Sequence, residues 1–163
     1  MARSYTPTAM YRYGAMQKAG GAGVRPYGPE LLDDPNFLLD ATPGSPGIPG
    51  WSVSEGTPGN CFISGGVFEC TGSNISNYGE QDRSDLVQGT SYRVVINVVS
   101  LAGGATAAVS WGSGVLFTPT TNIGETIFDI TMPANGEDVL LYVYSGSGIG
   151  TVVMTSLSIK EIL

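Results

Sequence analysis

The sequence predicts an all-β protein: a single β-sandwich or jelly roll of about eight or nine antiparallel strands, preceded by an extended N-terminal arm. Three observations favour this fold. Charged residues make up only 13% of the chain, while 24 glycines and 10 prolines supply many turn residues. Short segments rich in Val, Ile and Thr recur between these turns, which is typical of strands. No long segment has the apolar spacing of a helix.

The sequence predicts two parts, an N-terminal arm at residues 1–35 and a jelly-roll body at residues 36–163, and the charges differ between them. The first 29 residues carry +4 and the rest carries −11, which gives the net charge of −7. The arm cannot form a core of its own, so we expect it to become ordered against a partner, with a disordered tail as the alternative. Its basic and tyrosine residues are the expected partner-binding set: Arg3, Tyr5, Tyr11, Arg12, Tyr13, Lys18, Arg25 and Tyr27.

The body begins with a loop rich in proline and glycine at residues 42–50, and apolar segments of strand length follow it. Turn residues separate these segments, as in a sandwich. We expect strands at residues 51–53, 61–64, 67–70, 91–100, 105–111, 115–118, 126–132, 139–144 and 151–159. Residues 78–86 are expected to form an acidic loop.

The Gly65-Gly66 dipeptide predicts a two-residue hairpin turn. This turn places Cys61 opposite Cys70 as a non-hydrogen-bonded pair, close enough for a disulfide. A protein assembled in bacterial cytoplasm would instead keep both thiols reduced, as small buried hydrophobic residues. The sequence leaves both alternatives open.

The order of signals along the body resembles the carbohydrate-binding-module-like, galactose-binding-type jelly roll. The segments that carry this resemblance lie at residues 36–39, 50–53, 89–96, 103–112, 124–128, 140–144 and 157–160. Such modules occur in secreted glycosidases and in structural proteins of tailed bacteriophages. For a single module with a basic arm and no signal peptide, the resemblance implies a phage capsid decoration (cement) protein or a tail or fibre component.

The residue inventory argues against catalysis and cofactors. The chain has no histidine and only two cysteines, which excludes Ser-His and Cys-His nucleophiles and a four-cysteine zinc site. We therefore expect no enzyme and no cofactor. The acidic pI of about 4.3 argues against a nucleic-acid partner. The longest apolar segments are too short for a membrane helix, and the N-terminus lacks the apolar region of a signal peptide.

Two groups of side chains are candidate sites. Glu80, Asp82 and Asp85 are expected to lie in a solvated acidic loop, with a calcium site as one alternative and glycosidase carboxylates as another. Four aromatic residues either stack sugars on an exposed face or fill the core and pack subunits together. These are Trp51, Trp111, Tyr142 and Tyr144.

The leading hypothesis is a non-enzymatic virion structural protein, assembled in the host cytoplasm, that stabilises the phage head shell. Its partners would be the major capsid protein or other virion proteins. Residues 91–100 and 139–144 are apolar on both strand faces, so we expect self-association, with a trimer preferred and Tyr142 and Tyr144 in the contact. The alternative is a tail- or fibre-associated carbohydrate-binding module that recognises glycans on the host surface.

Overall fold

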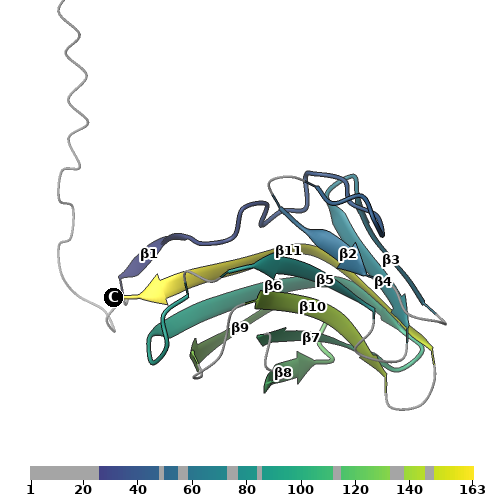
Figure 1. Ribbon diagram of the computed structural model, residues 1–163. Coiled ribbons are helices and arrows are strands. Elements are labelled where there is room, and N and C mark those ends of the chain that lie inside the picture. The colour runs from purple at the N-terminus through teal and green to yellow at the C-terminus, as the bar shows by residue number, and fades with distance from the viewer. Residues whose placement is uncertain are drawn as a thin grey trace, which may run out of the picture.

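The protein is a sandwich of two antiparallel β-sheets in the computed structural model (Figure 1). The structure describes residues 26–47, 50–54, 59–72, 77–83, 86–111, 115–132, 138–145 and 149–163. For residues 110–111, 115–119 and 138–145 it describes the backbone alone. No helix in these ranges is long and apolar enough to cross a membrane.

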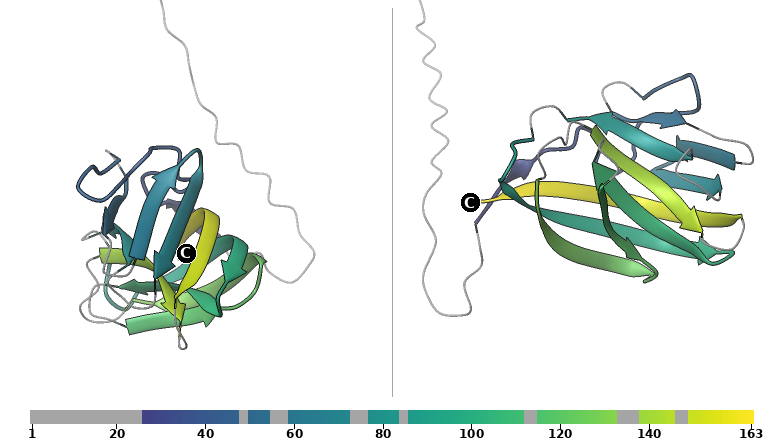
Figure 2. Two further views of the ribbon diagram at one scale, coloured as in Figure 1. Left: turned by 90° about the vertical axis from the view of Figure 1, so that its right-hand side faces the viewer. Right: turned by 60° about the horizontal axis from the view of Figure 1, so that its bottom comes forward.

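The first sheet has the strand order β3-β4-β11-β6-β9, and β1 also pairs with β11. Its strands are β1 (Tyr27–Glu30), β3 (Gly59–Ser64), β4 (Val67–Gly72), β6 (Ser91–Ala102), β9 (Gly124–Thr131) and β11 (Gly150–Ile162). The second sheet has the order β2-β5-β10-β7-β8. Its strands are β2 (Ser52–Ser54), β5 (Tyr78–Asp82), β7 (Ala105–Trp111), β8 (Val115–Thr120) and β10 (Asp138–Ser145). Figure 2 shows the sheets from two further directions.

The core lies between the sheets because the long strands β6 and β11 alternate buried and more exposed side chains. On β6 the buried residues are Tyr92, Val94, Ile96 and Val98. On β11 the alternation shifts near Met154, where the pairing with β6 is irregular. A bulge of this kind leaves an extra residue unpaired and bends the strand locally.

The predicted sandwich is confirmed, and every expected strand is present with small changes at its ends. Two further strands were not expected from the sequence. One is β5, which occupies part of the predicted acidic loop. The other is β1, which occupies part of the predicted arm.

The packed body begins earlier in the chain than predicted, because strand β1 is part of it. Tyr27 pairs with Ile162, and the backbone nitrogen of Leu163 donates to the oxygen of Pro26 at 3.0 Å. Further along, the nitrogen of Leu157 donates to the oxygen of Pro35 at 3.0 Å. The predicted boundary at residue 36 therefore lies inside a segment that covers the edge of β11. The other expected arm residues, from Arg3 to Arg25, lie outside the described residues.

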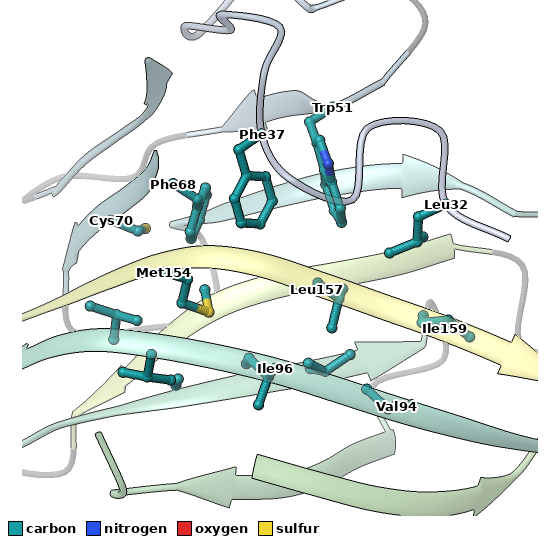
Figure 3. Close-up of a cluster of buried hydrophobic side chains, with 14 of the residues drawn as sticks. Leu32, Phe37, Trp51, Phe68, Cys70, Val94, Ile96, Met154, Leu157 and Ile159 are labelled. Carbon is teal, nitrogen blue, oxygen red and sulfur yellow. The ribbon is translucent and has the colours of Figure 1, made fainter. Parts of the chain in front are cut away.

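Phe37 sits at one end of the core, between two other aromatic rings (Figure 3). Its ring centroid is 5.6 Å from that of Trp51 and 5.9 Å from that of Phe68. All three side chains are fully buried. Phe37 has a φ of 54°, which is uncommon for a residue with a side chain. The carboxylate of Asp34 stabilises this turn by accepting the backbone N–H groups of Leu38 and Leu39 at 2.8 and 3.0 Å.

The β3–β4 hairpin has the predicted register, with Cys61 opposite Cys70. Gly65 and Gly66 both have positive φ, 61° and 82°, as a type I′ turn requires. The two cysteines are joined by a disulfide and their Cα atoms are 4.0 Å apart. Of the two alternatives that the sequence left open, the structure has the disulfide.

Candidate functional site

The outer face of the second sheet is the face turned away from the core. On β5, Gly79 and Gln81 are buried, while Tyr78 and Glu80 are half-buried. A Cβ atom on Gly79 would lie 2.9 Å from Cε2 of Phe68, so Gly79 faces the core. Because successive residues of a strand point to opposite faces, Tyr78 and Glu80 lie on the outer face.

The strand register brings a second tyrosine to this face. Tyr142 of β10 is directly opposite Tyr78 of β5 and Ala108 of β7. Directly opposed residues share a face of the sheet. Tyr142 is therefore at an outer-face position, and so is Tyr144, two residues further along the strand and opposite Thr106.

Ala108 shows that part of this face is covered. Its side chain is only 1% exposed, although the core residues of β7 are Ala105, Ala107 and Val109. The outer face therefore includes one small, buried residue on β7.

Polar groups lie beside the two tyrosine positions. Ser54 is opposite Tyr78, and Ser52 is opposite Glu80. Tyrosine side chains combine a broad apolar ring with a polar hydroxyl group. Hydroxyl and carboxylate oxygens accept hydrogen bonds from ligand hydroxyl groups. A face with both kinds of group suits a flat, hydroxyl-rich ligand.

The four predicted aromatic residues separate into two groups. For Trp51 the structure has the core-filling alternative, because its side chain is fully buried in the core. Trp111 follows the alternation of the core-facing residues Ala107 and Val109, and its register partner is Val139. It is therefore at a core-facing position. Tyr142 and Tyr144 remain as outer-face candidates.

Tyr78 belongs to this face but was not expected there. The sequence predicted an acidic loop at residues 78–86, and Gly79, Glu80 and Asp82 are residue types that are depleted in strands. The sequence shows that residue 78 is a tyrosine, but only the pairing of β5 with β10 places it on the outer face.

Two of the three acidic candidates lie in the described part of the chain. Glu80 and Asp82 lie on β5, where Glu80 is half-buried and Asp82 is exposed. Asp85 lies outside the described residues. In the described part of the chain, no group of three or more His, Cys, Asp or Glu side chains could hold a metal ion.

The outer face of the first sheet has a different chemistry. Nε and Nη2 of Arg93 donate to the two carboxylate oxygens of Asp129 at 2.7 and 2.9 Å. The guanidinium also lies 4.8 Å from the ring centroid of Tyr27. The hydrogen bond to Asp129 is the main cause that raises the pKa of Arg93 above its ordinary value. Tyr27 therefore contacts its own sheet.

The fold is similar to that of a solved carbohydrate-binding module, and two further structures align less well. A CBM4 structure aligns with a TM-score of 0.53 at 14% identity, over 80% of this chain and 99% of that chain. The CBM22-1–CBM22-2 tandem domain of Paenibacillus barcinonensis Xyn10C aligns with a TM-score of 0.46 at 13% identity, over 86% of this chain and 48% of that chain. Tailspike protein 4 of bacteriophage CBA120 gives 0.44 at 11% identity, over 82% of this chain and 21% of that chain.

No protein-family model matches the sequence, and no curated protein matches it either. The likeness to the CBM4 structure therefore shows the fold, a carbohydrate-binding-module-like β-sandwich. This agrees with the resemblance identified in the sequence.

Proposed function

We propose that the protein is a non-catalytic carbohydrate-binding module that binds glycans on the outer face of its second sheet. The observation that carries this proposal is the direct pairing of Tyr78 with Tyr142 across β5 and β10. Glu80 shares that face. The likeness of the fold to a CBM4 structure supports the same proposal.

The proposed binding mode uses the two tyrosines as a platform and Glu80 as a polar contact. Residues directly opposite on neighbouring antiparallel strands have Cβ atoms about 4.5–5.5 Å apart. Two aromatic side chains at that spacing cover an area comparable to a sugar ring. Ser52 and Ser54 on β2 would add hydroxyl groups at the rim.

A panel of soluble polysaccharides, followed by calorimetry on any that bind, tests this proposal with the full chain. Tyr78→Ala and Tyr142→Ala should each weaken binding at least tenfold, which corresponds to about 1.4 kcal/mol. Phe62→Ala is the matched control, because Phe62 is a half-buried aromatic residue on the outer face of the first sheet. The Phe62→Ala variant should bind the polysaccharide with the same affinity as the unmodified chain.

Two results would count against the proposal. One is that no polysaccharide of the panel binds. The other is that Phe62→Ala weakens binding as much as the two tyrosine variants. The proposal also predicts that the protein does not hydrolyse the glycan. Chromatography of the bound glycan after long incubation should therefore show no shortened product.

The capsid-decoration role stays a prediction from the sequence. Neither the described residues nor the comparisons test it, or the trimer and the virion partners that accompany it. The same holds for a location on a phage tail or fibre, where host surface glycans would be the ligand.

A further inference from the structure

The described part of the chain places its bases away from the outer face of the second sheet. It contains three bases, Arg83, Arg93 and Lys160. Arg93 lies at an outer-face position of the first sheet, where it donates to Asp129, and Lys160 of β11 is its register partner. Directly opposed residues share a face, so Lys160 also lies on the outer face of the first sheet. The other four bases of the chain precede Pro26 and lie outside the described residues.

Arg83, which follows β5, extends toward the core side of that strand. Its Nη1 atom lies 3.8 Å from Oδ2 of Asp33. The backbone nitrogen of Asp33 donates to Oε1 of Gln81 at 3.0 Å, and Gln81 is a buried residue of β5 on the same face as Gly79. The side chain of Arg83 is only 10% exposed. Its charge therefore does not lie on the outer face.

The outer face of the second sheet carries acidic positions beside its tyrosines. Glu80 and Asp82 follow Tyr78 at every second residue of β5, so these three residues lie on one face. Asp138 of β10 is directly opposite Asp82, which gives Asp138 an outer-face position as well. The acidic positions begin one step along the strand from the paired tyrosines and continue toward one end of the sheet.

The two outer faces differ in the sign of their charges. The first sheet has both signs, because Arg93 and Lys160 share its outer face with Glu69, Glu125 and Asp129. At the described outer-face positions of the second sheet, every charged residue is acidic. Hydrogen bonds from neighbouring groups leave the negative charge of a carboxylate in place. A surface of one sign attracts ions of the opposite sign and repels ions of its own.

This charge pattern bears on which glycan the second sheet accepts. Two residues along a strand are about 6.6 Å apart, so a sugar ring stacked on Tyr78 would lie beside Glu80. A sugar carboxylate or sulfate group would meet charge of its own sign there, and such contacts suppress binding. A sugar amino group, which is an ammonium ion at neutral pH, would meet a carboxylate acceptor next to an aromatic ring. Both interactions favour a cation.

We propose that the outer face of the second sheet selects glycans by charge. It excludes glycans with uronic acid or sulfate groups, and it binds a glycan with free amino groups more tightly than the uncharged form of that glycan. This inference rests on the proposed function, because it needs the glycan to lie on Tyr78 and Tyr142.

Calorimetry on the full chain tests the proposal with one polysaccharide in three forms. The polysaccharide is the tightest binder of the panel, and the forms are unmodified, lightly carboxymethylated and lightly aminoethylated. At about 0.01 M salt, where the screening length is about 30 Å, the aminoethylated form should bind about threefold or more tighter than the unmodified form. The carboxymethylated form should bind about threefold or more weaker. At about 1 M salt the screening length falls to about 3 Å, so the three affinities should converge.

Glu80→Gln and Glu125→Gln form a matched pair, because each removes one negative charge from the chain. Glu125 is exposed on the outer face of the first sheet, opposite Asn97. Glu80→Gln should reduce the affinity ratio of the unmodified to the carboxymethylated form by about half or more, since it removes the charge nearest the tyrosines. Glu125→Gln should leave that ratio unchanged. The ratio cancels the loss of any hydrogen bond that both forms make.

Equal affinities for the three forms at low salt would overturn the proposal and leave the proposed function in place. Tighter binding of the carboxymethylated form would do the same. Equal effects of Glu80→Gln and Glu125→Gln would also overturn it, because the selectivity would then come from the net charge of −7. If no unmodified polysaccharide of the panel binds, the proposed function itself fails and this inference falls with it.

Discussion

The indole nitrogen of Trp51 donates a buried hydrogen bond of 2.9 Å to the backbone oxygen of Asp34. This bond ties the segment that follows β1 to the residue that precedes β2. The carboxylate of the same Asp34 holds the turn that contains Phe37. One acidic residue thereby positions two of the three aromatic rings at this end of the core.

Trp51→Phe should lower the free energy of unfolding by at least about 1–3 kcal/mol, because the oxygen of Asp34 loses a buried hydrogen-bond donor. Phenylalanine keeps a six-membered aromatic ring but loses the N–H group and the five-membered ring, so unfilled volume adds to the loss. Urea denaturation checks this value. A change below about 0.5 kcal/mol would show that another donor replaces the indole.

Glu30→Gln should destabilise the attachment of β1 to the body. One carboxylate oxygen of Glu30 accepts the N–H groups of Leu31, Leu32 and Ile159 at 3.1, 3.2 and 2.9 Å, and the other accepts the hydroxyl of Ser158. Hydrogen bonds to an ionised acceptor are stronger than neutral ones, so we expect a loss of about 1–2 kcal/mol in calorimetry.

Glu125→Gln is the matched control for Glu30→Gln. Glu125 is exposed on β9, and substitutions at such positions usually change stability by less than about 0.5 kcal/mol. Equal losses in the two variants would mean that the network around Glu30 adds nothing beyond a surface charge.

Reduction of the disulfide should destabilise the protein by about 2–3 kcal/mol, since the bridge closes a short loop in the unfolded chain. Cys61 and Cys70 are nine residues apart, and both are fully buried. Urea curves with and without reductant measure the difference. A double variant, Cys61→Ala with Cys70→Ala, should not respond to reductant. Thiol labelling of the untreated, unfolded protein would contradict the presence of a disulfide.

Gly79→Ala should cost about 1–3 kcal/mol, a typical cost of overpacking a core. The added Cβ would lie 2.9 Å from the ring of Phe68, which is fully buried and has little room to move. Gly28→Ala is the control, because its Cβ would meet Glu161 at an ordinary 3.4 Å. Thermal unfolding of both variants should separate them clearly. Similar melting temperatures would show that the ring of Phe68 yields.

The apolar strands and the tight hairpin were predictable from the sequence because their signals are local. Gly65-Gly66 alone determines that Cys61 is opposite Cys70. Strand β7, Ala105–Trp111, was predicted with the bounds that the structure has. In such segments, side-chain size and turn chemistry point to the same structure.

Strands β1 and β5 were missed because their stability comes from pairing with distant segments. Tyr27–Glu30 contains a glycine and a proline, and its partner lies at the other end of the chain. Tyr78–Asp82 is mostly polar, and its place depends on β2 and β10. The residues of the candidate site also divide into those with a local signal and one that depends on distant pairing. Tyr142 and Tyr144 were recognised as site residues, whereas Tyr78 required the register.

The pairing of β1 with the end of β11 has a mechanical consequence. Pro26 and Leu163 lie side by side, so a pull on residues before Pro26 and on the C-terminus acts at the same end of this strand pair. Such a load opens hydrogen bonds one after another, as in unzipping, instead of shearing them together. Peeling would first meet strong resistance at Glu30, whose carboxylate accepts the N–H groups of Leu31 and of Ile159 on β11. The protein would lengthen under tension by releasing β1 while the two sheets stay packed.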